Sequence, residues 1–403
     1  MFADDWGEHP SSCQHLFRRV ARRHRTVWVN TLGLRAPRLT VDDLHRGARK
    51  VRRWFETSRD TAEAESASHS DEEAPCDVNV IAPPMLPWSR PSALRAVQRI
   101  ALRHSLEAAK TKFGLDRPVI VTTLPNAVDA LGVLGERRVV YYCVDDFTLW
   151  PGVDAIAART MEEELLARAD VVIATSEALR RSRTRGTNVP HSLPHGVDVE
   201  HLATASASET DPWPGVRNGR PVLGYLGLLD ERTDASLVAQ IARSRPDWDI
   251  VLVGPVDRVP EQLRRVPNIR RVPAVRYEQV PRVLAAFDVA ILPYARNELT
   301  RAINPLKLRE YLASGRPVVA TPLPEVAAYS DLVHLASNAE AFVAACAHAI
   351  DGPRDLRAER LPRLRGESWD ARAEAFLGMC LSANDRNTPA PGDPQHPSDE
   401  VTP

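Results

Sequence analysis

Short apolar runs alternate with helical stretches between residues 221 and 321, and this alternation constrains the fold more than any other feature of the chain. The runs read as strands at residues 221–227, 249–254, 269–272, 288–293 and 317–321. Helical stretches lie between them at residues 234–243, 261–265, 279–286 and 305–314. Strands that are apolar along their whole length are typical of a parallel sheet covered by helices on both faces. The segment therefore predicts a doubly wound α/β domain.

The first half of the chain shows the same alternation less clearly. Strands are predicted at residues 26–32, 78–81, 118–124, 138–144 and 170–175, and helices near residues 12–23, 91–113 and 154–168. A doubly wound domain is expected to open on an apolar strand. Here only Met1-Phe2-Ala3 precedes the acidic residues Asp4 and Asp5, so either this strand is truncated or upstream residues are missing.

A length of 403 residues suits two domains of this kind. We expect a Rossmann-like domain over residues 1–202, a linker over 203–220, a second Rossmann-like domain over 221–365 and a C-terminal helix over 366–382. Residues 57–75 have almost no large apolar side chains and predict a mobile loop, whereas the five prolines in residues 383–403 predict a disordered tail. Two similar domains joined by a linker indicate a ligand cleft between them.

Several protein classes are excluded by what the sequence lacks. No stretch approaches the ~18 uncharged apolar residues that a membrane helix needs, and the N-terminus has no basic and apolar signal region. The five cysteines are widely spaced without a Cys-x-x-Cys pair, which argues against zinc or disulfides and favours the cytoplasm. Neither half contains Gly-x-Gly-x-x-Gly or a Walker A loop. These absences argue against a dinucleotide-dependent oxidoreductase and against a P-loop nucleotide-binding protein.

The net charge of −1 hides a basic segment. Between Leu16 and Phe55 there are twelve Arg or Lys residues against two acids, Asp42 and Asp43. Such a segment could contact nucleic acid, anionic lipid headgroups or a phosphorylated substrate, or it could be a solvated face of an arginine-rich protein. Aromatic residues are not interleaved with the arginines as a nucleic-acid stacking platform requires. We therefore expect no nucleic-acid partner and at most weak contact with an anionic membrane.

Three weaker patterns have ordinary structural explanations. The segment Gly224–Arg232 follows a strand and precedes a helix, where backbone N–H groups could bind phosphate, but two glycines at a strand end often serve close packing. Asp247-Trp248-Asp249 has the form of an Asp-x-Asp metal motif, but it precedes a strand and is expected to be a turn at the wrong end of the sheet. The early group His9, Cys13 and His15 flanks a predicted helix cap, so we expect no metal site there.

The most informative segment is Asn304–Ala320, which reads NPLKLREYLASGRPVVA. Pro305 suits the first position of a helix and Gly315 suits its end, while Leu306 and Glu310 lie one turn apart on one face. A helix N-terminus with Lys307 in its first turn could bind a diphosphate, and a carboxylate one turn on could accept both hydroxyls of a ribose. The alternative is an ordinary amphipathic helix with an exposed Lys–Glu face. Lysine is rare here, with four against 48 arginines, which mildly favours the binding site.

This segment resembles the donor-site signature of GT-B glycosyltransferases, family 4-like, of the teichuronic-acid or exopolysaccharide type. Further stretches are similar to that family, and they occur at residues 141–147, 192–198, 224–227, 252–255 and 368–372. The resemblance covers roughly residues 4–381 and is most specific in the C-terminal half. It implies a GT-B fold, in which two doubly wound Rossmann-like domains face each other across a cleft.

The resemblance also implies roles for particular residues. A nucleoside-diphosphate sugar would bind the C-terminal domain and a surface-polysaccharide or lipid-linked glycan acceptor the N-terminal domain, with retention of configuration and without an obligatory metal or cofactor. Glu310 matches the second acid of the family's Glu-x7-Glu motif, whereas the first acid is replaced by Ala302. The expected donor-binding residues are Gly227, Arg232, Asn304, Pro305, Leu306, Lys307 and Glu310. The catalytic candidates are Asp146 and Asn304, and the acceptor-side candidates are His15 and Asp145.

The resulting hypothesis is a cytoplasmic glycosyltransferase that works near the inner face of the membrane. Arg232, Lys307 and the helix N-terminus at Pro305 would neutralise the leaving diphosphate. Two other classes stay open. A sugar-nucleotide epimerase of the same fold would convert the donor without an acceptor, and a nucleotide-sugar-binding scaffold would bind it without turnover.

Overall fold

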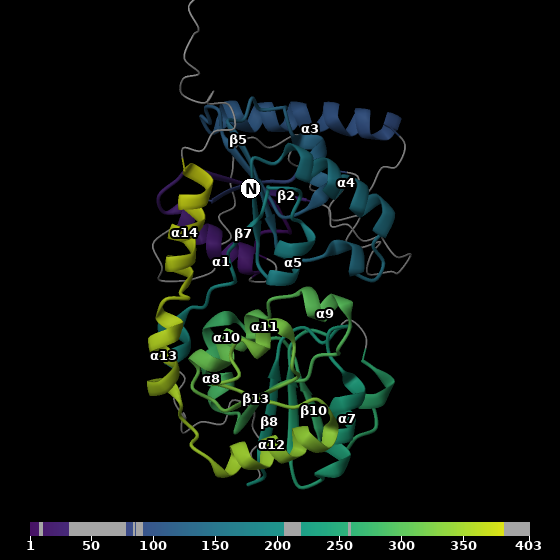
Figure 1. Cartoon of the computed structure of the whole chain (residues 1–403), viewed down its shortest axis with the longest axis vertical. Helices are drawn as coiled ribbons and strands as arrows, with labels where there is room; N and C mark the ends of the chain where they lie inside the picture. Colours follow the sequence, from purple (N-terminus) through teal and green to yellow (C-terminus); the bar gives the residue numbers. More distant parts are fainter. Residues whose placement is uncertain are drawn as a thin grey trace, which may run out of the picture.

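The computed structural model describes residues 1–7, 11–31, 78–83, 85, 92–204, 219–256 and 259–382. These residues form two α/β domains, one above the other in Figure 1. Each domain is built on one sheet whose paired strands are all parallel. The predicted fold class is therefore confirmed. The predicted mobile loop (residues 57–75), most of the linker (205–218) and the tail (383–403) lie outside the described residues.

The N-terminal sheet has seven strands in the order β3-β2-β1-β4-β5-β6-β7. Their bounds are β1 Phe2–Ala3, β2 Thr26–Asn30, β3 Val78–Ile81, β4 Val119–Thr122, β5 Arg138–Cys143, β6 Val171–Ala174 and β7 His191–Ser192. The first strand has two residues, and it lies between β2 and β4 near the middle of the sheet. Its side chains are buried because helices cover both faces.

The helices of this domain occupy the predicted connections. They are α1 Ser12–Ala21, α3 Ser92–Lys112, α4 Ala155–Arg168 and α5 Glu177–Ser182, with 3-10 turns at Pro125–Ala130 and Phe147–Leu149. Side-chain caps fix several of their starts: Ser11, Asp154 and Ser176 each accept a hydrogen bond from a backbone N–H of the first turn. A short helix, α6 Val199–Ala203, follows this domain and packs on the C-terminal one, where Val199 and Leu202 join its apolar cluster.

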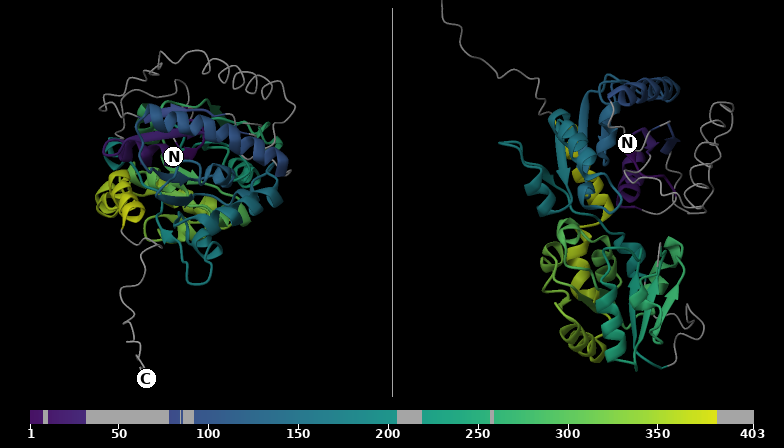
Figure 2. Two further views of the ribbon diagram at one scale, coloured as in Figure 1. Left: turned by 90° about the horizontal axis from the view of Figure 1, so that it is seen from above. Right: turned by 90° about the vertical axis from the view of Figure 1, so that its right-hand side faces the viewer.

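The C-terminal sheet has six strands in the order β10-β9-β8-β11-β12-β13. The strands are β8 Val222–Leu226, β9 Asp249–Val253, β10 Ile269–Val272, β11 Val289–Leu292, β12 Val318–Ala320 and β13 His334–Leu335. The helices are α7 Ala235–Ser244, α8 Val280–Ala285, α9 Glu298–Ala302, α10 Leu306–Ala313, α11 Pro324–Ala327, α12 Ala339–Asp351 and α13 Arg357–Arg365, with 3-10 turns at Glu261–Leu263 and Tyr277–Gln279. The side view in Figure 2 shows this green domain apart from the purple-to-teal domain above it.

The last helix, α14 Trp369–Leu381, returns to the N-terminal domain and packs along α1. Trp369 and Phe376 are almost fully buried, in one apolar cluster with Phe17, Trp28 and Tyr142. Burying a large apolar side chain contributes about 1.5–3 kcal/mol. The helix therefore stabilises the N-terminal domain while its preceding residues belong to the C-terminal one, so it ties the two domains together.

Candidate functional site

The carboxyl ends of both sheets meet at the junction between the domains. The Arg232 guanidinium, after β8, lies 5.2 Å from the centroid of the Trp150 ring, after β5. Ser176, after β6, donates from Oγ to the Ala302 carbonyl oxygen at 2.5 Å. Ligands of doubly wound domains bind beyond the carboxyl ends of the strands. The site is therefore sought at this junction.

Two glycines leave bare backbone at the end of neighbouring strands of the C-terminal sheet. Gly227 follows β8 with φ +142°, and Gly254 follows β9 with φ +139°. A Cβ on Gly254 would lie 2.2 Å from the Gly227 carbonyl oxygen, and a Cβ on Gly227 would lie 1.7 Å from Lys307 Cε. Gly224 differs, because it lies inside β8 against the Phe287 ring. Of the two glycines in the predicted phosphate loop, one packs the core and one faces the site.

Lys307 lies over Gly227 in the first turn of α10. Its Nζ is 5.8 Å from the centroid of the Tyr225 ring, and among the described residues it forms no ion pair. The helix begins directly after Pro305, so the first turn that carries this lysine also carries backbone N–H groups without an intrahelical partner. An anion bound here would meet the lysine, the helix N-terminus and the bare glycine backbone together.

Glu310 lies one turn further along α10 and is half-buried. Its carboxylate has no hydrogen-bond or ion-pair partner within the part of the chain that the structure describes. Burial raises the pKa of Glu310, and the charges of Lys307 and His201 oppose that shift. His201 stacks on Tyr277 with ring centroids 4.7 Å apart. A desolvated carboxylate with unused oxygens is a strong acceptor for ligand hydroxyls.

The residues before α10 are anchored to other parts of the molecule. The Asn304 amide donates to Glu325 Oε2 at 2.8 Å and accepts from Arg309 Nη1 at 2.6 Å. Glu325 Oε1 in turn accepts from the backbone N–H of Glu177, in the N-terminal domain, at 2.8 Å. Leu306 packs against the apolar cluster beneath α1 and α14. Both ends of the Asn304 amide are thus engaged within the protein, which favours a positioning role over the predicted catalytic one.

Arg232 is held by a carboxylate two residues before it. Its Nη2 lies 2.6 Å from Asp230 Oδ2, and its Nε donates to both oxygens of that carboxylate at 3.0 Å. Burial alone would lower the pKa of Arg232, but Tyr294 and Asp230 outweigh it and raise the pKa. The guanidinium is therefore always charged, and Asp230 is its counter-ion before any ligand binds.

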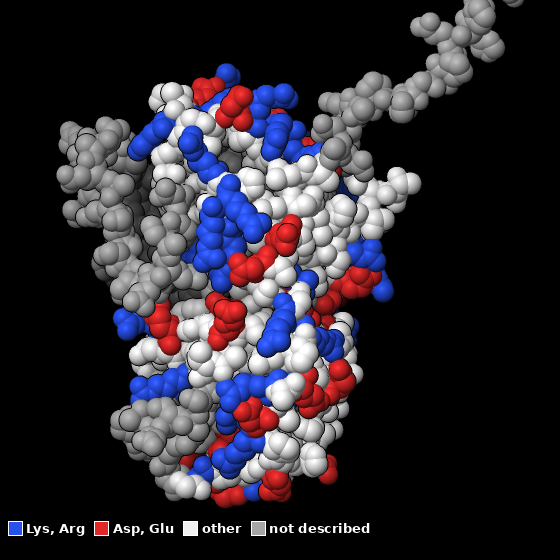
Figure 3. All heavy atoms as spheres, turned by 90° about the vertical axis from the view of Figure 1, so that its left-hand side faces the viewer, with Lys and Arg blue, Asp and Glu red and all other residues white. Residues whose placement is uncertain are grey.

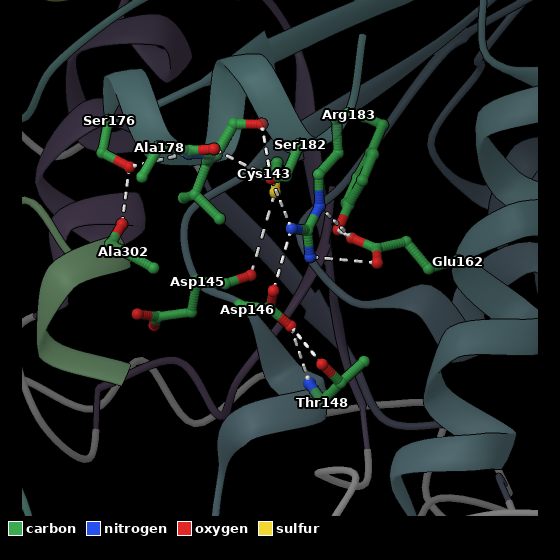
Figure 4. Close-up of polar contacts among 12 residues, drawn as sticks. Cys143, Asp145, Asp146, Thr148, Glu162, Ser176, Ala178, Ser182, Arg183 and Ala302 are labelled. Atoms are coloured by element: carbon green, nitrogen blue, oxygen red, sulfur yellow. Dashed lines mark hydrogen bonds and ion pairs between the residues drawn. The ribbon is translucent and has the colours of Figure 1, made fainter. Parts of the chain in front are cut away.

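Asp146 closes a buried network within the N-terminal domain (Figure 4). Its carboxylate accepts from Arg183 Nη1 at 2.9 Å and from the hydroxyl of Thr148 at 2.6 Å. Arg183 also forms an ion pair with Glu162 at 3.0 Å, and Glu162 accepts from the Tyr141 hydroxyl at 2.6 Å. Burial opposes ionisation of Asp146, but Arg183 and Thr148 hold its pKa below the usual value. This aspartate is a permanent anion with its own cation.

Asp145 behaves differently from its neighbour. Figure 4 shows its carboxylate pointing away from Arg183 and Asp146, and within the described residues it has no hydrogen-bond or ion-pair partner. Burial raises the pKa of Asp145 to about 6; Arg232 lowers it, and Asp146 and Asp230 raise it further. A carboxyl group of this kind at a domain junction exchanges its proton near neutral pH.

His15 contacts both domains but is enclosed by aromatic rings. Its imidazole stacks on Trp369 with centroids 5.4 Å apart and lies 4.9 Å from Tyr277. Burial, reinforced by Arg19 and Arg18, lowers the pKa of His15 to about 3, so the ring is neutral at physiological pH. The acceptor-side role assigned to His15 stays a prediction, and the ring lies beside Tyr277 of the C-terminal domain.

The other sequence patterns do not add to the site. Asp249 begins β9 at the opposite end of the sheet, is 1% exposed and pairs with Arg220 at 3.4 Å. Across the described ranges, no group of three His, Cys, Asp or Glu side chains could hold a metal ion. Likewise, no described helix is both long and apolar enough to cross a membrane.

The basic segment is described only over residues 16–31. Here Arg19 lies 3.2 Å from Asp198, Arg22 lies 3.7 Å from Asp370, and Arg25 donates to the Phe113 carbonyl oxygen. Figure 3 shows blue side chains gathered on the upper domain beside red ones, with both signs mixed over the lower domain. Arg19 and Arg22 are thus paired with carboxylates.

Sequence reasoning missed several residues that shape the junction. Asp230 could have been found from its spacing to Arg232, since a carboxylate two residues before an arginine is well placed to pair with it. Trp150, His201 and Tyr277 carry no local signal, because their roles arise only when distant segments pack together.

Comparisons with known proteins agree with this geometry. Residues 220–351 match the family described as glycosyl transferases group 1. A segment of 176 residues is 31% identical to the teichuronic acid biosynthesis glycosyltransferase TuaH of Bacillus subtilis, covering 41% of this chain and 44% of that protein. A segment of 184 residues is 28% identical to a GDP-mannose-dependent alpha-mannosyltransferase of Mycolicibacterium smegmatis, covering 45% and 46%. The matched segments thus span less than half of each relative's own length.

Solved structures resemble the whole chain. HepE of Anabaena, in complex with UDP and glucose, superposes with a TM-score of 0.65 at 14% identity, over 94% of this chain and 98% of that one. An Escherichia coli structure bound with UDP-2-fluoro glucose gives a TM-score of 0.61 at 12% identity, over 95% and 98%. At such identities the likeness establishes the fold alone. The predicted GT-B fold and the predicted family resemblance are confirmed.

Proposed function

We propose, from the premise that residues 220–351 form a group 1 glycosyl transferase domain in a chain of GT-B fold, that this protein is a nucleotide-sugar-dependent glycosyltransferase. The C-terminal domain binds a nucleoside-diphosphate sugar, and the N-terminal domain binds the acceptor. Both curated relatives are named as glycosyltransferases, and HepE was solved with UDP and with UDP-glucose. These names support the class of donor.

The observation that carries the proposal is the position of Lys307. An ammonium without an ion-pair partner among the described residues lies over the bare backbone of Gly227, at the N-terminus of a helix. These three features all favour a bound anion. The diphosphate carries the charge that grows as the sugar departs, so a fixed cation at this point stabilises the transition state more than the bound donor. Arg232 adds a second positive charge, oriented by Asp230.

Glu310 completes the donor site. With its carboxylate one turn beyond Lys307, it accepts hydrogen bonds from the ribose hydroxyls of the nucleoside. The partial burial that raises its pKa also strengthens each hydrogen bond that it forms, because competing water is scarce there. Pro305 sets the start of the helix, and Asn304 and Leu306 hold that start in place.

On the acceptor side we assign the contact to Asp145 rather than Asp146. Asp146 already has Arg183 as its counter-ion, whereas the Asp145 carboxylate is free of partners within the described residues. With a pKa of about 6, Asp145 can accept a proton from an acceptor hydroxyl or hold a sugar hydroxyl at neutral pH. Asp146 positions the loop that carries Asp145.

The acceptor is a surface-polysaccharide or lipid-linked glycan, by analogy with the teichuronic acid function in the name of TuaH. The sugar is transferred with retention of configuration, no metal is required, and the work is done in the cytoplasm near the inner face of the membrane.

A donor panel tests the proposal first. Thermal unfolding is measured with UDP, GDP and ADP and with their sugars, because a ligand at 100 times its dissociation constant stabilises the fold by about 2.7 kcal/mol. The donor that stabilises the protein is then incubated with and without candidate acceptors. Stabilisation by none of these nucleotides would refute the proposal.

The same incubation separates the two alternatives. An epimerase would change the sugar of the donor when no acceptor is present. A binding scaffold, which the replacement of an expected acid by Ala302 favours, would be stabilised by a donor but would transfer its sugar to no acceptor. Transfer that requires an acceptor excludes both.

A further inference from the structure

Three arginines gather at the end of the C-terminal sheet that faces away from the domain junction. Arg316 lies between α10 and the start of β12, Arg354 lies between α12 and α13, and Arg357 is the first residue of α13. The loop between α12 and α13 runs along the outer side of the lower domain, on the left of Figure 1. Because β12 begins here, this arginine group is separate from the proposed donor and acceptor sites at the carboxyl ends of the strands.

Two members of the arginine group already have a carboxylate partner. Arg354 Nη1 lies 2.7 Å from Asp288 Oδ1, and Arg357 Nη2 lies 2.5 Å from Asp355 Oδ2. The other Asp288 oxygen accepts from the Val222 N–H at 2.8 Å, at the start of β8. Each carboxylate is therefore already engaged by one arginine and is not free to move to a third.

The third member, Arg316, has no such partner within the described residues. It is 7% exposed, yet its Nε has no hydrogen-bond partner and its guanidinium forms no ion pair there. Burial lowers the pKa of Arg316; the Asp355 carboxylate opposes that shift, and the Arg357 guanidinium adds to it. Asp288 and Arg354 act on the same guanidinium, so it lies within electrostatic reach of both ion pairs. A buried cation without hydrogen bonds is costly unless a ligand supplies them.

The backbone around Arg316 is fixed and brings Arg357 close to it. Gly315 has φ +79°, and a Cβ there would lie 2.5 Å from Arg357 Cγ. The Gly315 carbonyl oxygen accepts from the Leu356 N–H at 2.9 Å, and the Arg316 carbonyl oxygen accepts from Arg360 Nη1 at 2.5 Å. The start of α13 is thus held against the segment that carries Arg316, and the arginine group is assembled by contacts outside its own guanidinium groups.

We propose that the arginine group binds a tetrahedral oxyanion of the phosphate class, with Arg316 as its main ligand and with Arg354 and Arg357 at its rim. Three guanidinium groups against two carboxylates leave a positive charge for an anion. A guanidinium presents its N–H groups in a planar fork that pairs with two oxygens of a phosphate, and further oxygens remain for the other two arginines. This inference is independent of the proposed function.

An ordinary structural explanation accounts for less of the geometry. A cation just after a helix can stabilise its C-terminal carbonyl groups, and Arg316 follows α10. In that case its guanidinium would donate to those carbonyl oxygens, but it forms no such hydrogen bond across the described ranges. A bound oxyanion would meet the unused N–H groups directly.

The test compares thermal unfolding of the full chain in sodium chloride and in sodium phosphate at equal ionic strength and equal pH. Arg316→Met removes the central guanidinium and keeps a long side chain. Arg354→Met changes an exposed member of the group and leaves the buried packing intact. Arg363→Met is the matched control, because this arginine of α13 pairs with Asp331 at 3.1 Å outside the group. Lys307→Ala reports on phosphate bound at the proposed donor site instead.

Phosphate should raise the thermal midpoint of the parent protein by about 3 °C or more relative to chloride. Arg316→Met should lose most of this gain and Arg354→Met part of it, whereas Arg363→Met and Lys307→Ala should keep it. In calorimetry, Arg316→Met should lower the affinity for inorganic phosphate about tenfold or more. In chloride alone, this variant should be at least as stable as the parent, because burial disfavours the charge that it removes.

Several outcomes would overturn the proposal. A gain that Lys307→Ala loses and Arg316→Met keeps would place the phosphate at the donor site. Equal gains in all variants would show only the general stabilisation that phosphate salts give to folded proteins, and no gain in the parent would refute the site outright. Lower stability of Arg316→Met in chloride with an unchanged phosphate gain would make Arg316 purely structural. If Arg316→Met does not fold, a full gain in Arg354→Met would refute the proposal.

Discussion

Replacing Asp145 by asparagine should make the protein more stable at neutral pH and less active. The Asp145 carboxyl lacks a partner among the described residues, and burial raises its pKa from 3.8 to about 6. Its ionised form is therefore disfavoured in the folded protein. Asparagine keeps the size of the side chain and has no charge to desolvate. A residue that destabilises the fold at the domain junction is expected to be there for a ligand.

The sign and size of the expected change in stability follow from the pKa of Asp145 in the unfolded and in the folded protein. Between about pH 4 and pH 6 the folded state binds more protons than the unfolded state, so the free energy of unfolding falls as the pH rises. The full penalty is present above about pH 6 and absent below about pH 4. A shift of about two units corresponds to about 3 kcal/mol at 1.36 kcal/mol per unit. Because Asp145 is only partly buried, we expect Asp145→Asn to add about 1–2 kcal/mol at pH 7.5.

Urea unfolding at pH 4.5 and pH 7.5 measures the difference in the free energy of unfolding between Asp145→Asn and the parent protein. The unfolding midpoints are compared with one shared value for the dependence of the free energy on urea concentration. The adjacent Asp146→Asn is the matched control, because Arg183 and Thr148 lower the pKa of Asp146. That variant should lose stability at pH 7.5. Transfer to an acceptor should fall by roughly 10²-fold or more in Asp145→Asn while nucleoside diphosphate affinity is kept. Destabilisation by Asp145→Asn at pH 7.5, or an equal effect at both pH values, would refute the reasoning.

The remaining predictions concern the donor site and the basic segment. Lys307→Ala should weaken binding of a nucleoside diphosphate by about ten- to hundredfold and leave nucleoside binding almost unchanged in calorimetry, since a charge-assisted hydrogen bond contributes ~1.5–3 kcal/mol; equal losses for both ligands would exclude a phosphate contact. Glu310→Gln should lower the affinity for the donor roughly tenfold. A 2′-deoxy donor should bind the parent protein with a similar loss of affinity, but should bind the variant with little further loss. Fully additive losses would overturn the ribose contact. Gly227→Ala should also lower the affinity for a nucleoside diphosphate, because its Cβ would collide with Lys307. Gly186→Ala, at positive φ in open space, should affect stability alone. Equal diphosphate affinity in the two variants would contradict a role of Gly227 in binding. The segment Leu16–Phe55 should attach weakly to anionic vesicles in sedimentation and release as salt approaches ~0.15 M, and equal binding to neutral vesicles would contradict this.

Local patterns were sufficient to predict most of the fold. Buried parallel strands appear in the sequence as apolar runs. The strands β8, β9, β11 and β12 could therefore be predicted to within one or two residues of their observed bounds. The two-residue strands β7 and β13 could not be established this way, because two residues carry no period. Both lie at one edge of their sheets.

The donor side of the site was also accessible from the sequence. Lys307 and Glu310 share a helix, so their spacing alone places them on one face, and the structure keeps them together. The acceptor side was not accessible in the same way. Asp145 and Asp146 are adjacent and chemically identical in the sequence, and only the position of Arg183, 37 residues after Asp146, distinguishes them. Which carboxylate has a counter-ion depends on tertiary contacts that no local pattern encodes.

The polar chain through Asn304 explains how the donor helix is connected to the rest of the molecule. It begins at the Glu177 N–H in the N-terminal domain and passes through Glu325 and Asn304 to Arg309 on α10. Arg309 then donates to Glu367 at 2.7 Å, just before α14. Buried charge-assisted hydrogen bonds are costly to leave unmade, so movement of one domain against the other must either carry this chain along or break it. The first turn of α10, which carries Lys307, is therefore positioned by the same contacts that join the two domains.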